Sequence, residues 1–155
     1  MKTTSTIFAI ALVAVGFTAA GHAAEKKISH SDLPPAVQKT AQEQSKGATV
    51  KGYSQDNENG QLEYEVEMTV NGHSKDVSIA KDGSVVEVEE QVEMGSLPEN
   101  VQSGLKAKAG KGTITKVESI TKHGSLVAYE AQVKTMGKRS EIQVGPDGKP
   151  LDHEE

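Results

Sequence analysis

The sequence contains no cysteine and no tryptophan. Without cysteine the chain has no disulfide, no thiol nucleophile and no thiolate metal ligand, so a packed core has to supply its stability. Both phenylalanines lie within the first 23 residues, and the remaining aromatic residues are Tyr53, Tyr64 and Tyr129. Because single-stranded nucleic acids and sugars are usually bound by stacking on aromatic rings, this composition argues against both classes of ligand.

The most apolar stretch of the chain is short. Residues 7–17 form a run of about 11 apolar residues, whereas a membrane-spanning helix needs about 20. A basic residue, Lys2, precedes the run and small residues follow it at 18–24, which is the order of a secretory signal peptide. We predict a signal peptide at 1–23 with cleavage after Ala23, against the alternative of an N-terminal anchor helix. The mature chain is then periplasmic or secreted, without a stable membrane span.

Charge is divided unevenly along the mature chain. Residues 56–93 contain eleven acidic residues against Lys75 and Lys81 alone, a net charge of −9. Residues 97–144 contain eight basic and four acidic residues, a net charge of +4. The chain as a whole is acidic, with a net charge of −5, which argues against nucleic acid as a partner.

A repeated pattern organises the rest of the sequence. Residues 31–38 (SDLPPAVQ) align with residues 95–102 (GSLPENVQ) at an offset of 64. The Tyr-Glu pairs that begin at Tyr64 and Tyr129 align at an offset of 65, which fits one inserted residue. We interpret the chain as a linker at 24–30 followed by two copies of one unit, at 31–92 and 95–155.

Each copy predicts a helix followed by strands. The helix begins at a Leu-Pro pair, since proline suits the first turn, and ends at Gly47 or Gly110. Alternating apolar and polar residues, most clearly at 61–71, predict half-buried antiparallel strands, and Asn-Gly and Asp-Gly pairs predict the hairpin turns between them. The expected strands are 49–57, 61–71, 73–80 and 84–90 in the first copy, and 113–121, 125–135, 138–145 and 149–153 in the second.

The predicted fold class is therefore α+β. We expect two tandem repeats, each with one helix followed by a three- to four-stranded antiparallel meander sheet. A unit of about 60 residues is marginally stable alone, so the two copies are expected to pack as one body, with edge-to-edge joining of their sheets left open.

Several landmarks resemble a known family. Leu-Pro-x-x-Val at 33–37 and 97–101, Gly-x-x-x-Tyr-Glu-Val at 60–66 and Asp-Gly at 82–83 resemble the PepSY-like family of exported bacterial proteins. That family is related to the β-lactamase-inhibitor fold. The resemblance implies binding of a protein or peptide outside the cytoplasm, with inhibition of a peptidase as one form of it. The matching positions are structural, so the resemblance implies no functional residue.

Residue patterns for catalysis are absent from the sequence. The mature histidines are not paired at metal-ligand spacing, and no nucleophile-elbow or phosphate-loop motif occurs. We expect a non-enzymatic protein with no catalytic residue, no cofactor and no metal site.

One candidate binding face remains, on the polar sides of two strands. Like charges on neighbouring strands repel, so a cluster of them has a cost. The cluster is either a docking face for an exported protein or peptide, an ordinary solvated face, or a surface that the basic second half of the chain compensates. Cation binding, or an accessory role in envelope stress, is the alternative function. The candidate residues are Glu63, Glu65, Glu67, Glu87 and Glu89.

Overall fold

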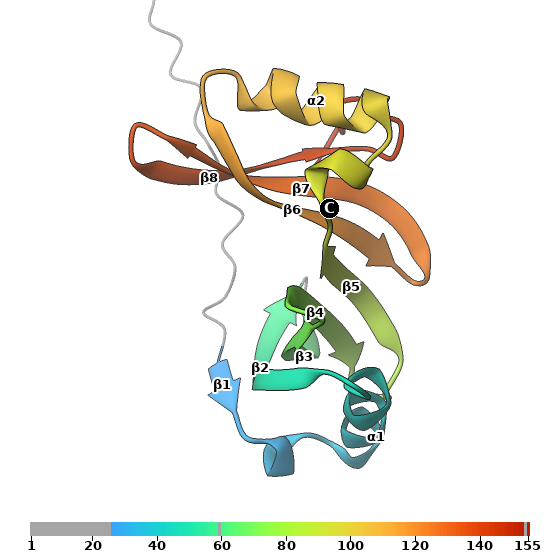
Figure 1. Cartoon of the computed structure of the whole chain (residues 1–155). Coiled ribbons are helices and arrows are strands. Elements are labelled where there is room, and N and C mark those ends of the chain that lie inside the picture. Colours follow the sequence, from blue (N-terminus) through green and yellow to red (C-terminus); the bar gives the residue numbers. More distant parts are fainter. Residues whose placement is uncertain (1–25, 59, 154) are drawn as a thin grey trace, which may run out of the picture.

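The computed structural model describes residues 26–58, 60–153 and 155 (Figure 1). The predicted signal peptide at 1–23 lies outside the described residues. The helices are η1 (His30–Asp32), α1 (Pro35–Gln44), η2 (Met94–Ser96) and α2 (Glu99–Ala109). The strands are β1 (Lys26–Ile28), β2 (Thr49–Glu58), β3 (Gln61–Val70), β4 (His73–Ala80), β5 (Val85–Gln91), β6 (Thr113–Lys122), β7 (Ser125–Thr135) and β8 (Lys138–Val144).

All eight strands belong to one antiparallel sheet, in the order of the chain. The predicted fold class, two tandem helix-plus-meander repeats, is therefore wrong. β5 and β6 pair from Glu87 with Lys122 to Gln91 with Glu118, so the sheet runs through the expected boundary between the two copies. The repeat pattern specifies strands and turns, but it does not specify which strands meet at the edges. An unpaired β5 edge would expose a row of backbone hydrogen-bonding groups, and β6 satisfies them.

Two strand predictions at the ends of the sheet also fail. β1 lies in the segment expected to be a linker, and it pairs with β2 from Lys26 with Gln55 to Ile28 with Tyr53. The strand expected at 149–153 is reduced to a single bridge between Val144 and Pro150. Proline has no N–H to donate to a ladder, which accounts for the second failure.

Both long helices begin in the same way. Pro34 and Pro98 occupy the N-cap positions with extended backbone. In α1 the side chain of Gln38 donates a hydrogen bond from Nε2 to the carbonyl oxygen of Leu33 at 2.8 Å. In α2 Gln102 makes the matching bond to Leu97 at 2.9 Å. These bonds tie the first turn of each helix to the chain that leads into it.

The helices bury their apolar faces against one face of the sheet. Figure 1 shows α1 and α2 at opposite ends of the molecule, on the outer sides of a sheet that bends between them. Each helix closes its own core. The α1 core contains Leu33, Val37, Ala41, Tyr64, Val66, Met68, Val77 and Ile79. The α2 core contains Leu97, Val101, Leu105, Val117, Ala131 and Val144.

Tight turns whose second residue is glycine join several of the strands. Asn71, His123 and Met136 have positive φ angles of 52°, 49° and 50°, and a glycine with positive φ follows each of them. Two successive residues with positive φ make the turn that matches the right-handed twist of a hairpin. Within the part of the chain that the structure describes, no helix is long and apolar enough to cross a membrane.

A glycine in the middle of α2 allows close packing that the helix pattern does not reveal. A Cβ atom added at Gly104 would overlap the carbonyl oxygen of Gly148, in the turn after β8. Asn100, one turn earlier, donates a hydrogen bond from Nδ2 to the carbonyl oxygen of Asp147 at 2.7 Å. The turn at 147–148 therefore lies directly on the backbone of α2.

We predict that Gly104→Ala destabilises the protein, although alanine favours a helix by about 1 kcal/mol over glycine. The added methyl group has to push the 147–148 turn away, which we expect to lower the free energy of unfolding by about 1–3 kcal/mol. Denaturant unfolding measures the change. Gly95→Ala is the matched control, because nothing lies within 4 Å of a Cβ atom at Gly95. Unchanged stability of Gly104→Ala would contradict the packing described.

Candidate functional site

The structure brings all five predicted glutamates to one face of the sheet, opposite the helices. On β3, Glu65 pairs with Ser78 of β4, which pairs with Glu87 of β5. In the next row, Glu67 pairs with Asp76, which pairs with Glu89. Directly paired residues point to the same side of a sheet, so these rows place the side chains together. We call this surface the inner face, defined by Glu63, Glu65, Glu67, Asp76, Glu87, Glu89 and Glu118.

A cavity of about 180 Å³ opens on the inner face over β2 to β5. Six of its eight lining residues are acidic. No lysine or arginine is among the described residues that line it. The lining residues are Asp56, Glu63, Tyr64, Glu65, Asp76, Ser78, Glu87 and Glu89.

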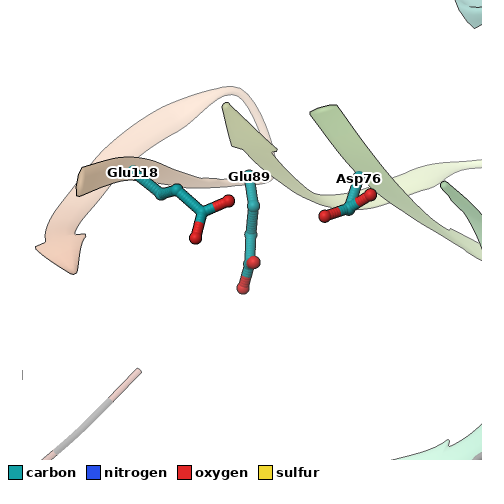
Figure 2. A group of neighbouring side chains, drawn as sticks. All are labelled: Asp76, Glu89 and Glu118. Carbon is teal, nitrogen blue, oxygen red and sulfur yellow. The ribbon is translucent and has the colours of Figure 1, made fainter. Parts of the chain in front are cut away.

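Beside the cavity three carboxylates come close together. Figure 2 shows Asp76, Glu89 and Glu118 leaving three neighbouring strands on the same side. One carboxylate oxygen from each lies within 4.8 Å of the others. We call this group the carboxylate triad. Since β4, β5 and β6 contribute one residue each, the triad exists only because the sheet continues from β5 to β6.

Burial and crowding disfavour ionisation in the triad. Burial raises the pKa of Glu89 to about 9, with further contributions from a hydrogen bond with Glu87 and from the charges of Glu87, Glu130 and Glu118. Burial likewise raises the pKa of Asp76 to about 6, because the nearby charge of Lys116 offsets only part of the effect. Near neutral pH, Glu89 therefore carries a proton.

Lysines of β6 compensate part of this charge. Lys116 forms an ion pair with the buried Glu118 at 2.5 Å, and Ser74 donates a hydrogen bond from Oγ to the same carboxylate at 3.3 Å. Lys122 reaches across the β5–β6 junction to Glu87 at 3.3 Å. The second half of the chain thus contributes countercharge to the first, as one of the sequence hypotheses proposed.

Sequence reasoning missed two members of the triad. Asp76 was within reach of prediction, because the Asn71-Gly72 turn fixes the register that places it beside Glu67. Glu118 was not, because its position depends on the pairing of β5 with β6. The candidate Glu63 lies at the other end of the inner face, paired with Ala80 of β4.

Comparison with known proteins gives matches in structure alone. No family model matches the chain, and no curated protein matches its sequence. A proposed periplasmic protein from Bacteroides eggerthii is similar with a TM-score of 0.65 and 20% identity, over 77% of this chain and 86% of that one. A DUF2874 family protein from Bacteroides ovatus has a TM-score of 0.60 and 19% identity, over 78% and 86%. A BLIP-like protein from Bacteroides fragilis has a TM-score of 0.56 and 17% identity, over 77% and 83%.

Likeness at such low identity shows a shared fold. The single antiparallel sheet that carries α1 and α2 is therefore an architecture already found in solved bacterial proteins. The PepSY-like resemblance of the sequence landmarks stays a prediction.

We predict that the protein becomes less stable as pH rises from about 5 to about 9. Glu89 and Asp76 bind protons more tightly in the folded than in the unfolded chain, so the folded state gains stability wherever they remain protonated. The effect of Asp76 is lost as pH rises from its ordinary value of 3.8 to about 6. The effect of Glu89 is lost between 4.5 and about 9.

Thermal unfolding of Glu89→Gln across this pH range checks the prediction. The variant keeps the shape of a protonated glutamate, so it should melt higher than the wild type at pH 8 and show a flatter profile above pH 6. Glu43→Gln, which changes an exposed glutamate of α1, is the control and should follow the wild-type slope. A Glu89→Gln profile parallel to that of the wild type would contradict the assignment.

Proposed function

We propose that this chain is an exported, non-enzymatic binding module that takes a cationic segment of a protein or peptide onto its inner face. One observation carries the proposal. The cavity over β2 to β5 is lined by six carboxylic acids without a basic residue among its described lining. A lysine or arginine side chain of a partner would add positive charge to this acidic lining.

The energetics of the inner face favour such a ligand. Burying carboxylates without enough countercharge raises the pKa of Asp76 and of Glu89, so part of the face stays protonated. A bound cation favours the ionised forms and drives the protons off. Binding is therefore coupled to proton release, and affinity should increase as pH rises.

Likeness to known structures supports an exported binder. One structural neighbour is described as a periplasmic protein and another as BLIP-like. Together with the predicted signal peptide, these likenesses support a location in the periplasm or outside the cell. Inhibition of a peptidase is the narrower form of the proposal, and the PepSY-like resemblance of the sequence supports it.

Isothermal titration with a short Lys/Arg-rich peptide tests the proposal. We expect binding that weakens with added salt and tightens between pH 6 and pH 8. Binding should also release protons, which is measured by comparing the binding enthalpy in buffers of different ionisation enthalpy. The double variant Asp76→Asn/Glu89→Gln should lose about tenfold in affinity, since two partly buried charges contribute on the order of 1.4 kcal/mol. The same double variant is expected to remain folded, because it removes repulsion.

Two controls make the titration decisive. An acidic peptide of the same length should show no binding at the cavity. The variant Glu43→Gln, on the exposed side of α1, should bind the basic peptide like the wild type. Equal affinity of the wild type and the double variant, or affinity that is insensitive to salt, would overturn the proposal.

Divalent-cation binding is the second candidate, and the carboxylate triad favours it. Calcium binds oxygen ligands at about 2.3–2.6 Å, so oxygens within 4.8 Å of one another fit around a single ion. The ion pair of Lys116 with Glu118 opposes this function, because a cation would have to compete with the ammonium group. Calcium titration separates the two candidates. If calcium produces neither binding heat nor a change in melting temperature of the wild type, the cation function is excluded. If the wild type does bind calcium at the triad, Asp76→Asn should abolish the binding.

A further inference from the structure

The side of the sheet that forms the inner face carries a second polar site, over β6 to β8, outside the acidic cavity. At its centre is Gln143 of β8, whose side chain is buried at 5% exposure although it faces away from the α2 core. Gln143 pairs with Glu130 of β7, and its Nε2 donates a hydrogen bond to the Glu130 carboxylate at 3.0 Å. A polar side chain buried on a sheet face away from the core needs an occupant that covers it.

That occupant is the backbone of Glu155. Its N–H donates to Oε1 of Gln143 at 2.8 Å, and its backbone oxygen accepts from Nε2 of Gln143 at 3.4 Å. The amide group of Gln143 therefore pairs with both hydrogen-bonding groups of one residue, as a neighbouring strand would. Such a contact recognises the peptide backbone, so any residue with a free N–H can make it whatever its side chain.

A lysine adds selectivity for charge. Lys122 of β6 lies 3.6 Å from the Glu155 carboxylate and 3.3 Å from that of Glu87. Its position between the two carboxylates favours an acidic side chain in the occupant. The Glu155 side chain remains 26% exposed, so solvent reaches the ion pair with Lys122.

We propose that Gln143, Glu130 and Lys122 form a binding site for one acidic residue of an extended peptide, which Glu155 occupies within the same chain. An external peptide binds by displacing Glu155, with its backbone on Gln143 and its carboxylate on Lys122. This site does not depend on the proposed cationic ligand. If the chain binds both ligands, Lys122 links the two sites, because its ammonium group also contacts Glu87 at the edge of the acidic cavity.

The test frees the site in the full-length chain and supplies the occupant from solution. Glu155→Pro removes both the N–H that Gln143 accepts and the carboxylate near Lys122. The probe is an amidated peptide with the sequence of residues 150–155, titrated into isotopically labelled protein and followed by NMR. We expect it to bind Glu155→Pro about tenfold more tightly than the wild type, since a hydrogen bond and an ion pair no longer compete.

Two matched changes show whether the contacts are the ones described. Gln143→Ala in the Glu155→Pro background should abolish the shifts, and so should a probe in which the last glutamate is replaced by lysine. Circular dichroism confirms that each variant is folded. The proposal is overturned if folded Glu155→Pro binds the probe no better than the wild type, or if Gln143→Ala leaves binding intact. Failure of the Lys/Arg-rich peptide to bind elsewhere on the face would leave this result unaffected.

Discussion

The pairing of β5 with β6 holds the inner face together. It joins the strands that pack under α1 to those that pack under α2, and it is made by only five residue pairs, from Glu87–Lys122 to Gln91–Glu118. Because of this junction, acids of the first half of the chain meet both an acid and the lysines of the second half. The carboxylate triad and the Lys122–Glu87 ion pair both depend on it.

The junction also raises the free energy of ionising the carboxyl groups of the inner face. Like charges on neighbouring strands repel, and the lysines of β6 neutralise Glu118 and Glu87 while Glu89 stays protonated near neutral pH. Stability and ligand binding therefore oppose each other at the same carboxyl groups. A cationic partner would favour ionisation of these carboxyl groups and relieve part of their mutual repulsion, which adds to the affinity. The site over β6 to β8 has the opposite preference, since Lys122 and Gln143 accept an acidic residue there.

Much of the local structure follows from the sequence, whereas the tertiary arrangement of the sheet does not. Hairpin dipeptides such as Asn71-Gly72, and strict alternation along β3, predicted seven of the strands closely, because turn geometry and period-two burial are local properties. β1 has only three residues, too few to show a pattern. The five candidate glutamates share a face because β3 to β5 follow local turns. Glu118 and Gln143 escaped prediction because edge pairing and the return of Glu155 are set by contacts between distant parts of the chain.

The most direct measurement of this account is an NMR titration of the side-chain carboxyl carbons of the glutamates and aspartates in the folded protein. The account predicts that Glu89 titrates near pH 9 and Asp76 near pH 6, both well above the ordinary pKa values of these side chains. Titration of Glu89 in the range of exposed glutamates would show that the inner face is solvated and uncrowded. That result would contradict the buried carboxylate cluster on which the proposed binding depends.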